Sequence, residues 1–315
     1  MMKKKTRYRI RNWKEYNRSL RERGSLTFWM SKGLLANWLE REKTGERGRP
    51  PVYTEAAIRA MMQIRFVFHQ AGRQTCGFVS SVFKMMRVAL PVPDHSTLSR
   101  RMGGVDIRLP VKSKTKPRHI VCDSTGVKVY GEGEWKVRQH GYTKRRTWLK
   151  LHFQADEATG EIIVAGASTN SVSDGEMFVE MIGMNTEDIE QISGDGAFDQ
   201  RKVYSAIGHC GVKRVAIPPQ SNARIWQHGN SKEKPLARDQ NLRSIRRLGK
   251  AKWKQKSNYH RRSLAETEVF RFKTIFSDKL QSRQIDNQFQ EMFIKCAALN
   301  RMTHLGMPDS YKIAA

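Results

Sequence analysis

The sequence predicts a mixed α/β sheet preceded by an all-helical region, and three observations support this fold class. From Arg118 onward, three consecutive apolar, partly β-branched segments, 118–130, 147–157 and 161–169, are bounded by glycine and polar clusters. Helical and strand patterns then alternate, which is typical of a mixed sheet with helices on its faces. Before Pro110 the apolar residues recur at helical spacing instead. A chain of 315 residues can bury such a core together with an accessory domain.

The region before Pro110 is expected to form several helices. The first covers about 16–23, and an apolar stripe follows in residues 26–40. After a break at RGRPP, residues 47–51, Thr54 stands where it can cap the next helix. The residues expected on the buried face of that helix are Ala57, Ile58, Met61 and Met62. The RGRPP segment resembles a hook for the minor groove of DNA, but a plain linker is the favoured interpretation.

A helix-turn-helix is expected at the end of this region. The pattern indicates a helix from about Arg73 to Val88, then a turn with prolines, then the short helix HSTLSRRM. Such a helix can enter the major groove with its first residues at base edges. Arg100 and Arg101 are its candidate DNA contacts. Short helices with serine, threonine and arginine are common, so a purely structural role is the alternative.

Helices and strands alternate after the third strand. The expected elements are a helix at 174–183, a strand at 189–197, a helix at 198–208 and a strand at 212–219. Residues 218–258 are polar and basic, with 12 lysines or arginines and two acids between Lys232 and Arg262. We interpret them as a basic insertion, and a flexible, solvated segment is as compatible with the composition as a folded one. Two helices, about 259–280 and 286–305, close the chain.

The charge of the chain indicates a polyanionic partner. Lysine and arginine total 58 against 30 acidic residues, for a formal net charge of +28. Such a charge destabilises a compact protein by self-repulsion unless a polyanion neutralises it. Nucleic acid is the expected partner, because phosphate contacts release counterions and drive binding. A ribosomal or membrane-surface protein is the competing explanation, but ribosomal proteins are usually shorter and lack the carboxylates described below.

The sequence shows no signal for export or for a membrane span. The basic N-terminal segment has no apolar core of a signal peptide. No stretch approaches the roughly 18 uncharged apolar residues that a spanning helix needs. The cysteines are too dispersed for a zinc finger, at Cys76, Cys122, Cys210 and Cys296. We therefore expect a cytoplasmic protein with reduced thiols and no membrane partner.

One helical face near the C-terminus carries four chemically distinct side chains. Their spacing of three, four and seven residues places them within an arc of roughly 60° on an α-helix. They are Tyr259, Arg262, Glu266 and Lys273. A carboxylate beside basic groups and a phenol is suited to hold a phosphate next to a metal ion. The simpler alternative is a surface helix with ion pairs four residues apart, such as Arg262 with Glu266.

Three carboxylates occur where metal chemistry needs them. Asp123 lies inside the first strand, where an uncompensated charge is costly. Asp195 lies between glycines just after a strand, and Glu266 lies on the helical face. Oxygen ligands with a phosphate partner describe a Mg²⁺ site, and two such ions can drive phosphoryl displacement. A buried, hydrogen-bonded aspartate and a turn residue are the structural alternatives for Asp123 and Asp195, and Asp199 is a rival that more plausibly caps the next helix.

The segment YHRRSLAETEVFRFK resembles the signature of bacterial DDE transposases of the insertion sequence four and five families. With GEGEWKVRQHG and LNRMTHLGMP, the chain is most similar to the insertion sequence nine-oh-three type of the five family. The resemblance covers nearly the whole chain. It implies a ribonuclease H-like sheet flanked by helices, with Asp123, Asp195 and Glu266 as catalytic ligands of Mg²⁺ or Mn²⁺, two ions in all. It also implies supporting roles for Tyr259, Arg262 and Lys273.

The resemblance implies three parts for the chain. Residues 1–110 are the expected helical DNA-binding domain, 111–305 the catalytic domain with its insertion, and 306–315 a tail. Within the catalytic domain, Trp135 is expected to stack on a base at the DNA end, although a core tryptophan is equally plausible. Lys136 and Arg138 flank it as DNA contacts.

The resemblance implies a transposase with double-stranded DNA as its partner. It would bind the terminal inverted repeats, cut at the element ends and join the 3′-hydroxyl to target DNA. A homo-oligomer in the synaptic complex and a nucleoid-associated location are expected. The alternatives are a DNA-binding regulator, which would have no use for three converging carboxylates, and a related nuclease that cuts without joining.

Overall fold

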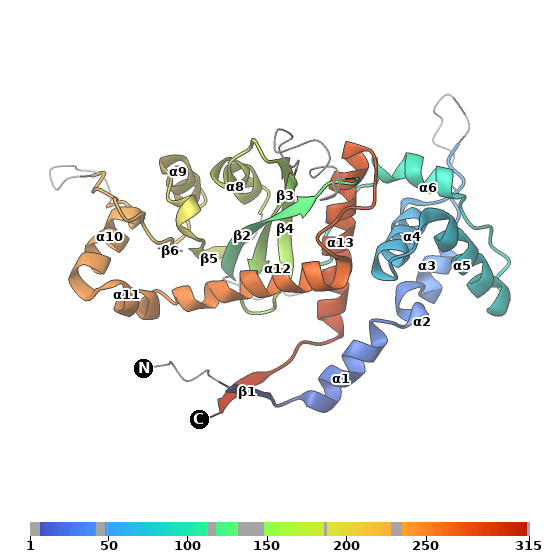
Figure 1. Ribbon diagram of the computed structural model, residues 1–315, viewed down its shortest axis with the longest axis horizontal. Helices are drawn as coiled ribbons and strands as arrows, with labels where there is room; N and C mark the ends of the chain where they lie inside the picture. Colours follow the sequence, from blue (N-terminus) through green and yellow to red (C-terminus); the bar gives the residue numbers. More distant parts are fainter. Residues whose placement is uncertain are drawn as a thin grey trace, which may run out of the picture. The chain divides into compact units, whose positions relative to one another are not determined.

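The computed structural model describes residues 7–41, 48, 50–112, 118–131, 148–185, 188–227 and 235–313. These residues divide into two compact units (Figure 1). One unit contains the chain up to Pro110 together with the segment from Ala297 onward, and the other contains Val111–Cys296. Each unit has its own buried side chains and is described by itself below.

A mixed sheet forms the centre of the second unit, as the sequence predicted. Its strands are β2 (Arg118–Lys128), β3 (Trp148–Asp156), β4 (Ile162–Thr169), β5 (Ile189–Ser193) and β6 (Arg214–Ala216), in the spatial order β4-β3-β2-β5-β6. The pairs β2–β3 and β3–β4 are antiparallel, whereas β2–β5 and β5–β6 are parallel. This order is compatible with the expected ribonuclease H-like fold.

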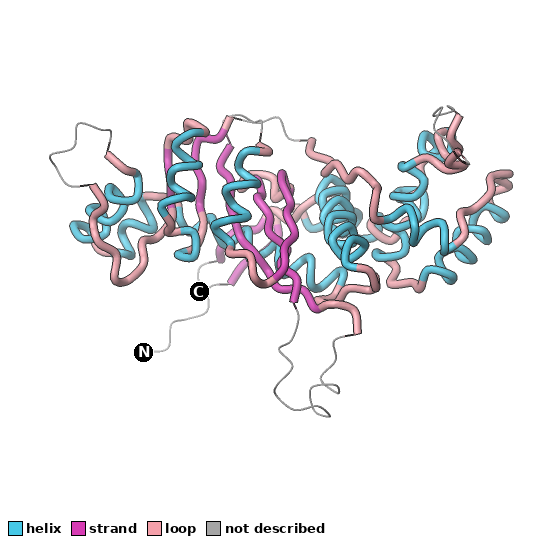
Figure 2. The backbone as a smooth tube through the Cα atoms, turned by 90° about the horizontal axis from the view of Figure 1, so that it is seen from above, coloured by secondary structure: helices cyan, strands magenta, loops and turns pink. Residues whose placement is uncertain are grey.

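Helices cover both faces of this sheet (Figures 1 and 2). Ile120 and Cys122 of β2 are buried in one hydrophobic cluster with residues of α8 (Asp174–Gly183) and α9 (Arg201–His209). Because side chains alternate along a strand, the residues between them face the other side. There β2 contacts α12 (Ser263–Phe276). The alternation of β2 thus separates a hydrophobic face from a face that can carry polar groups.

Helix α8 covers the predicted range 174–183, and its start has a clear local cause. The hydroxyl of Ser173 accepts a hydrogen bond from the Glu176 amide at 3.3 Å. In return, the Glu176 carboxylate accepts one from the Ser173 amide at 2.9 Å. This capping box satisfies two amides that the first helical turn leaves without partners.

The elements after α8 are shorter than the sequence predicted. Strand β5 ends at Ser193 because the chain turns into the short 3₁₀ helix η1 (Gly196–Phe198). Helix α9 consequently begins at Arg201 rather than 198, and β6 covers only Arg214–Ala216. These differences lie at element boundaries, where local signals are weakest.

The basic insertion is folded where the structure describes it. It contains α10 (Ala237–Leu248) and α11 (Lys250–Lys256), so the flexible interpretation is wrong for this part; residues 228–234 lie outside the described residues. Trp253 anchors it: this side chain is 2% exposed, and its indole donates to Asn241 at 3.1 Å. The fully buried Asp239 accepts hydrogen bonds from the Trp226 and Gln227 amides. Polar anchors of this kind leave no apolar periodicity in the sequence.

The C-terminal helices depart from the prediction in one respect. The expected helix at 259–280 is divided into a 3₁₀ turn, η2 (Tyr259–Arg262), and α12, which ends before Ser277 at a positive φ of 68°. Helix α13 (Ile285–Leu305) follows. In its first half Glu291 pairs with Lys295 at 2.6 Å, and both side chains are fully buried.

The first unit is mainly helical. Its helices are α1 (Trp13–Glu22), α2 (Leu26–Trp29), α3 (Lys32–Ala36), α4 (Glu55–Val67), α5 (Gly72–Met85) and α6 (His95–Met102). The predicted cap of α4 is confirmed, because the Thr54 hydroxyl accepts from the Ala57 amide at 3.2 Å. The four residues predicted for its inner face, from Ala57 to Met62, are all fully buried.

The expectation of an all-helical first unit is wrong at its ends. Strand β1 (Arg7–Ile10) pairs antiparallel with β7 (Ser310–Ile313), so the expected C-terminal tail includes a strand. The segment from Ala297 also belongs to this unit, because Arg301 bonds to Gln63 and to the Phe28 carbonyl. The expected boundary at residue 305 therefore differs from the observed division. In the part of the chain that the structure describes, no helix has the length and apolar character of a bilayer span.

Candidate active site

Asp123 is the central carboxylate of the candidate site. It lies on the α12 face of β2, and its side chain is 17% exposed. It accepts a hydrogen bond from the Ser124 amide at 2.9 Å. Burial raises the pKa of Asp123 despite that hydrogen bond and the nearby Arg262 guanidinium; the charges of Asp195 and Glu266 raise it further. All three predicted carboxylates therefore lie close enough to interact electrostatically.

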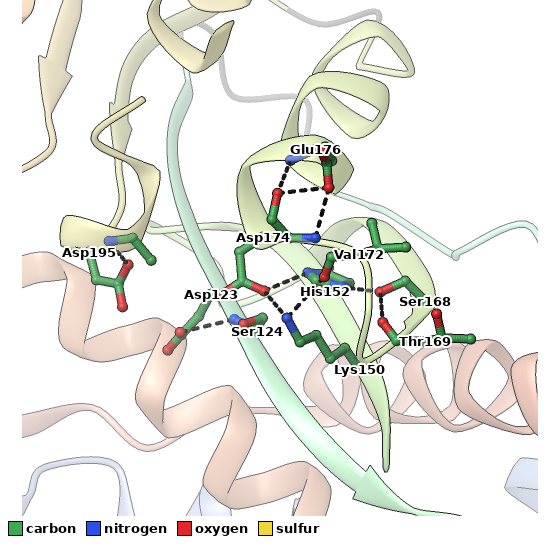
Figure 3. A network of polar contacts seen from close by, with 12 residues as sticks. Asp123, Ser124, Lys150, His152, Ser168, Thr169, Val172, Asp174, Glu176 and Asp195 are labelled. Carbon is green, nitrogen blue, oxygen red and sulfur yellow. Dashed lines mark hydrogen bonds and ion pairs between the residues drawn. The ribbon is translucent and has the colours of Figure 1, made fainter. Parts of the chain in front are cut away.

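Asp195 reaches the site because β5 runs parallel to β2. In the register of these strands Val121 is paired with Ser193, so Asp123 and Asp195 each follow by two residues. Asp195 follows the end of β5, near enough to Asp123 for its charge to raise the pKa of that carboxyl; Figure 3 labels both residues. Asp195 also caps η1 by accepting from the Ala197 amide at 2.8 Å. Asp195 therefore has the structural role in a turn that was the alternative for it, in addition to its position at the site.

Steric crowding explains why a glycine, Gly194, precedes Asp195. A Cβ atom at Gly194 would lie 2.7 Å from the ring of Phe198, closer than real Cβ contacts. Phe198 is buried in the core beneath the loop. The absence of a side chain at Gly194 therefore lets the ring pack under the loop that carries Asp195.

Glu266 joins the site through Arg262. The Arg262 guanidinium lies 3.6 Å from Asp123 and also donates to the Glu266 carboxylate, which confirms the predicted pair four residues apart. Glu266 itself is 60% exposed, whereas Arg262 is 17% exposed. One half-buried cation thus lies between two of the three carboxylates.

The donor set fits a hard divalent cation by its chemistry, since carboxylate oxygens are the ligands that Mg²⁺ prefers. Burial is the main cause of the raised pKa of Asp123, and the smaller repulsion from Asp195 and Glu266 adds to it; a bound cation would relieve that repulsion. Among the described residues, however, no three His, Cys, Asp or Glu side chains are grouped closely enough to hold a metal ion. In this structure the positive charge between Asp123 and Glu266 belongs to Arg262.

Tyr259 lies beside the carboxylates, but not on a continuous α-helix with them. It belongs to η2, so the single helical face predicted for the four residues is wrong at its start. Its ring packs on Trp253 at 5.6 Å and lies 6.0 Å from the Arg262 guanidinium. Burial raises the pKa of Tyr259, and the charges of Asp195 and Glu266 act in the same direction.

Lys273 lies farther along α12. Its charge contributes to the lowered pKa of Asp278, whose main cause is the hydrogen bond from Lys128. The Lys128 ammonium lies 2.8 Å from Asp278. The structure therefore associates Lys273 with this ion pair at the end of the helix, and its electrostatic effect is seen at Asp278 rather than at Asp123.

A buried polar network supports the opposite face of β2 (Figure 3). His152 of β3 is paired with Ser124 and bonds through Nε2 to the Ser168 hydroxyl at 2.8 Å. Its other nitrogen lies 3.7 Å from Asp174, which pairs with Lys150 at 3.2 Å. Burial lowers the pKa of His152 to about 4, so the imidazole is neutral at neutral pH. The arrangement contains serine, histidine and aspartate, but Ser168 is 5% exposed and inaccessible to a substrate.

Asp199 has a role that the sequence did not indicate. The expected cap of the next helix is wrong, because Gln200 occupies that position. Instead Asp199 forms a buried ion pair with Arg238 at 2.7 Å and accepts from the Gln220 amide at 2.9 Å. The Arg238 guanidinium also lies 3.7 Å from the centre of the Trp226 ring. This pair connects the loop after Asp195 to helix α10 of the basic insertion, and no local pattern could have revealed it.

The remaining predicted DNA contacts are spread over other parts of the chain. Trp135, Lys136 and Arg138 lie outside the described residues. Arg100 is exposed on α6, whereas Arg101 donates to the Tyr53 carbonyl and is partly buried.

The helices around α6 differ from the expected helix-turn-helix. The connection from α5 to α6 has nine residues, 86–94, against about three or four in that motif. The connection from α4 to α5 has four residues, 68–71, and matches the motif better.

Comparison with known protein families gives two matches. One model, described as a transposase DDE domain, matches residues 114–301, and a second with the same description matches residues 21–132. The first match covers all three carboxylates and more than half of the chain. No solved structure matches the chain.

Proposed function

Because the chain belongs to the family of the transposase DDE domain, whose members cleave DNA and transfer its strands, we propose that Asp123, Asp195 and Glu266 carry this reaction. The observation that supports the assignment best is the parallel pairing of β2 and β5, after which Asp195 follows near enough to Asp123 for its charge to raise the pKa of that carboxyl. Glu266 is linked to the same place through Arg262. The finer proposal is an insertion-sequence transposase of the five family, nine-oh-three type.

The proposed chemistry consists of two phosphoryl transfers at one site. Water first attacks the phosphodiester at the element end and exposes a 3′-hydroxyl, which then attacks target DNA; no covalent bond to the protein forms. Two Mg²⁺ or Mn²⁺ ions, when bound, would activate the attacking oxygen and stabilise the leaving oxygen. The three carboxylates would hold them, with DNA phosphate completing the coordination.

The basic and phenolic groups of η2 and α12 would orient the substrate. Arg262 would exchange its carboxylate partners for a phosphate oxygen, since planar guanidinium groups bind both. Tyr259, with a raised pKa, stays protonated and can donate a hydrogen bond to phosphate. Lys273 would contribute charge toward the DNA backbone.

The proposed partners are the terminal inverted repeats, target DNA and further copies of this chain in a synaptic complex. The helical unit is the proposed DNA-binding part, and nucleoid association would follow from its substrate. The net charge of +28 supports a polyanionic partner.

The test is a cleavage and joining assay with the full chain and Mg²⁺. Asp123→Asn keeps the size of the side chain but removes its charge, so cleavage should fall by about 10³-fold or more while DNA binding persists. Asp286→Asn, an exposed change at the start of α13, is the matched control. Full cleavage by Asp123→Asn would refute the assignment. Joining of pre-cleaved ends by the unmodified chain would separate a transposase from a nuclease that only cuts.

A further inference from the structure

An arginine-lined pocket lies in the helical unit, and the proposed chemistry does not use it. It has a volume of about 270 Å³, and every residue that lines it belongs to that unit. This volume far exceeds the roughly 10–15 Å³ that a single water needs. The lining residues that matter for the argument are Trp29, Arg59, Gln63, Arg108 and Arg301.

The hydrogen-bond partners of Arg301 in this pocket are neutral groups. Its guanidinium donates to the Gln63 side-chain oxygen and to the Phe28 carbonyl, each at 2.6 Å. It also lies 4.8 Å from the centre of the Phe28 ring and 4.7 Å from that of Trp29. These contacts fix the orientation of the guanidinium, but they do not neutralise it. Burial lowers the pKa of Arg301, as it does for a cation without a compensating carboxylate.

Arg59 lines the same pocket with a second guanidinium. It lies on α4, one helical turn before Gln63. One of its terminal nitrogens donates to the Asp106 carbonyl at 2.8 Å. Its Nε, which is shielded from solvent, has no hydrogen-bond partner. Arg108, by contrast, is 87% exposed at the rim and pairs with the Asp106 carboxylate at 2.9 Å. In the described residues, no ion pair joins Arg59 or Arg301 to an acid.

Two buried arginines of the second unit, unlike Arg59 and Arg301, pair with carboxylates. Arg118 lies 3.6 Å from Asp156, and Arg238 lies 2.7 Å from Asp199, with all four side chains almost fully buried. Buried charges are normally paired in this way, because desolvation of an unpaired charge is costly. Arg59 and Arg301, by contrast, line an open cavity and, among the described residues, bond to neutral partners only. Their uncompensated charges therefore favour the binding of an external anion.

We propose that this pocket binds a phosphate group of the DNA backbone. Guanidinium groups match phosphate oxygens with paired, charge-assisted hydrogen bonds, and two fixed ones form a preorganised receptor. DNA is the source of the phosphate because the chain carries a net charge of +28. The inference depends on DNA being the substrate, but it does not depend on the role of the three carboxylates.

The test measures how DNA affinity of the full chain depends on salt. Each phosphate contact that is lost should lower the slope of log K against log [salt] by about one. A 30-base-pair duplex of arbitrary sequence is the probe, followed by fluorescence anisotropy, because the contact is independent of sequence. The variants are Arg59→Gln and Arg301→Gln. Arg18→Gln on α1, an exposed position outside the pocket, removes the same charge and serves as control.

The expected result is a slope lower by about one in each pocket variant, with the slope of Arg18→Gln unchanged. Arg301 supports the fold, so Arg59→Gln, whose thermal melting should match that of the parent chain, carries the decision. An unchanged slope in Arg59→Gln, or an equal drop in Arg18→Gln, overturns the proposal.

A second measurement separates the source of the phosphate. Broadening of the ³¹P signal of inorganic phosphate by the parent chain but not by Arg59→Gln, together with an unchanged DNA slope, would assign the pocket to free phosphate and overturn the DNA assignment. Asp123→Asn should keep the parent slope while it loses cleavage. Failure of the pocket and failure of the catalytic assignment are therefore distinguishable.

Discussion

The Arg262 guanidinium lies 3.6 Å from the Asp123 carboxylate, at the point where strand β2 meets helix α12. Through its other side the same guanidinium contacts Glu266. The cation that compensates these carboxylates in this structure is thus part of the chain. It follows that divalent ions and Arg262 compete for the same negative charge.

We expect Arg262→Gln to bind Mn²⁺ more tightly than the parent chain in the absence of DNA. The variant leaves Asp123 and Glu266 without their cation, so the metal no longer displaces an ion pair. A gain of roughly threefold to tenfold, about 0.7–1.4 kcal/mol, is expected, because Glu266 is 60% exposed and charges about 4 Å apart in water interact by only about 1 kcal/mol. Isothermal titration calorimetry measures the affinity. Arg262→Lys keeps the charge and should bind Mn²⁺ like the parent; a weaker or equal affinity of Arg262→Gln would contradict the competition.

We expect Asp199→Asn to destabilise the second unit. The variant removes the nearer of the two buried carboxylates that contact Arg238 and leaves Asp239, 3.4 Å away. The loss should therefore be smaller than the roughly 3–5 kcal/mol of a buried charge left with no partner, and we expect about 1–3 kcal/mol. Denaturant unfolding measures the loss. Glu190→Gln, which breaks an exposed pair with Arg214, is the control and should cost less than about 1 kcal/mol. Equal stability of the two variants would mean that the buried pair does not hold the insertion to the loop after Asp195.

We expect the stability of the chain to fall as the pH drops from about 6.5 to about 4. Burial lowers the pKa of His152 to about 4 from its ordinary 6.5. Between these two pH values the unfolded chain therefore binds a proton at this histidine that the folded chain does not bind. The stabilisation is complete above pH 6.5 and is lost as the pH falls, by on the order of 3 kcal/mol for such a histidine. His119, with its pKa also lowered to about 4, acts in the same sense.

The pH dependence is checked by unfolding the chain between pH 4 and 7.5. His152→Asn should flatten the decline, since asparagine does not titrate. His209→Asn, at an exposed position on α9, is the control and should leave the decline intact. A parent-like decline in His152→Asn would show that the buried imidazole is not its source.

We expect charge removal on α11 to weaken DNA binding through its salt dependence. Lys250 and Lys252 are exposed, whereas Lys254 lies 5.2 Å from the Tyr259 ring and is half-buried. The double variant of Lys250 and Lys252 to glutamine should lower the salt slope by about two if both contact phosphates. Lys213→Gln, exposed in another loop, is the control. An unchanged slope would place the DNA contact of the insertion elsewhere.

The local signals of the sequence were sufficient for much of the fold. The three strands after Arg118, the cap at Thr54 and the helix from Asp174 to Gly183 all match the structure closely. Each depends on periodicity or capping within a few residues, so the information lies in the segment itself. The pair of Arg262 and Glu266 was foreseen for the same reason, since helical geometry brings residues four apart together.

Signals failed where polar contacts between distant segments decide the structure. The insertion appeared featureless, yet Asp239 and Trp253 are buried within it. Likewise, Asp199 was expected at a helix cap, but it pairs with Arg238, 39 residues away. The energy of a buried ion pair depends on where the chain brings the two groups, and neither residue shows its partner in the local sequence.

The sequence by itself determined the strand and helix pattern, the strong positive charge and the positions of the three candidate carboxylates along the chain. Only the tertiary structure decided that the charge of Asp195 acts on Asp123, because the parallel pairing of β2 and β5 joins segments about seventy residues apart. It also decided that Arg301, near the C-terminus, lines the same pocket of the helical unit as Arg59. Periodicity records which face of an element is buried, whereas the meeting of distant charges depends on how those faces pack.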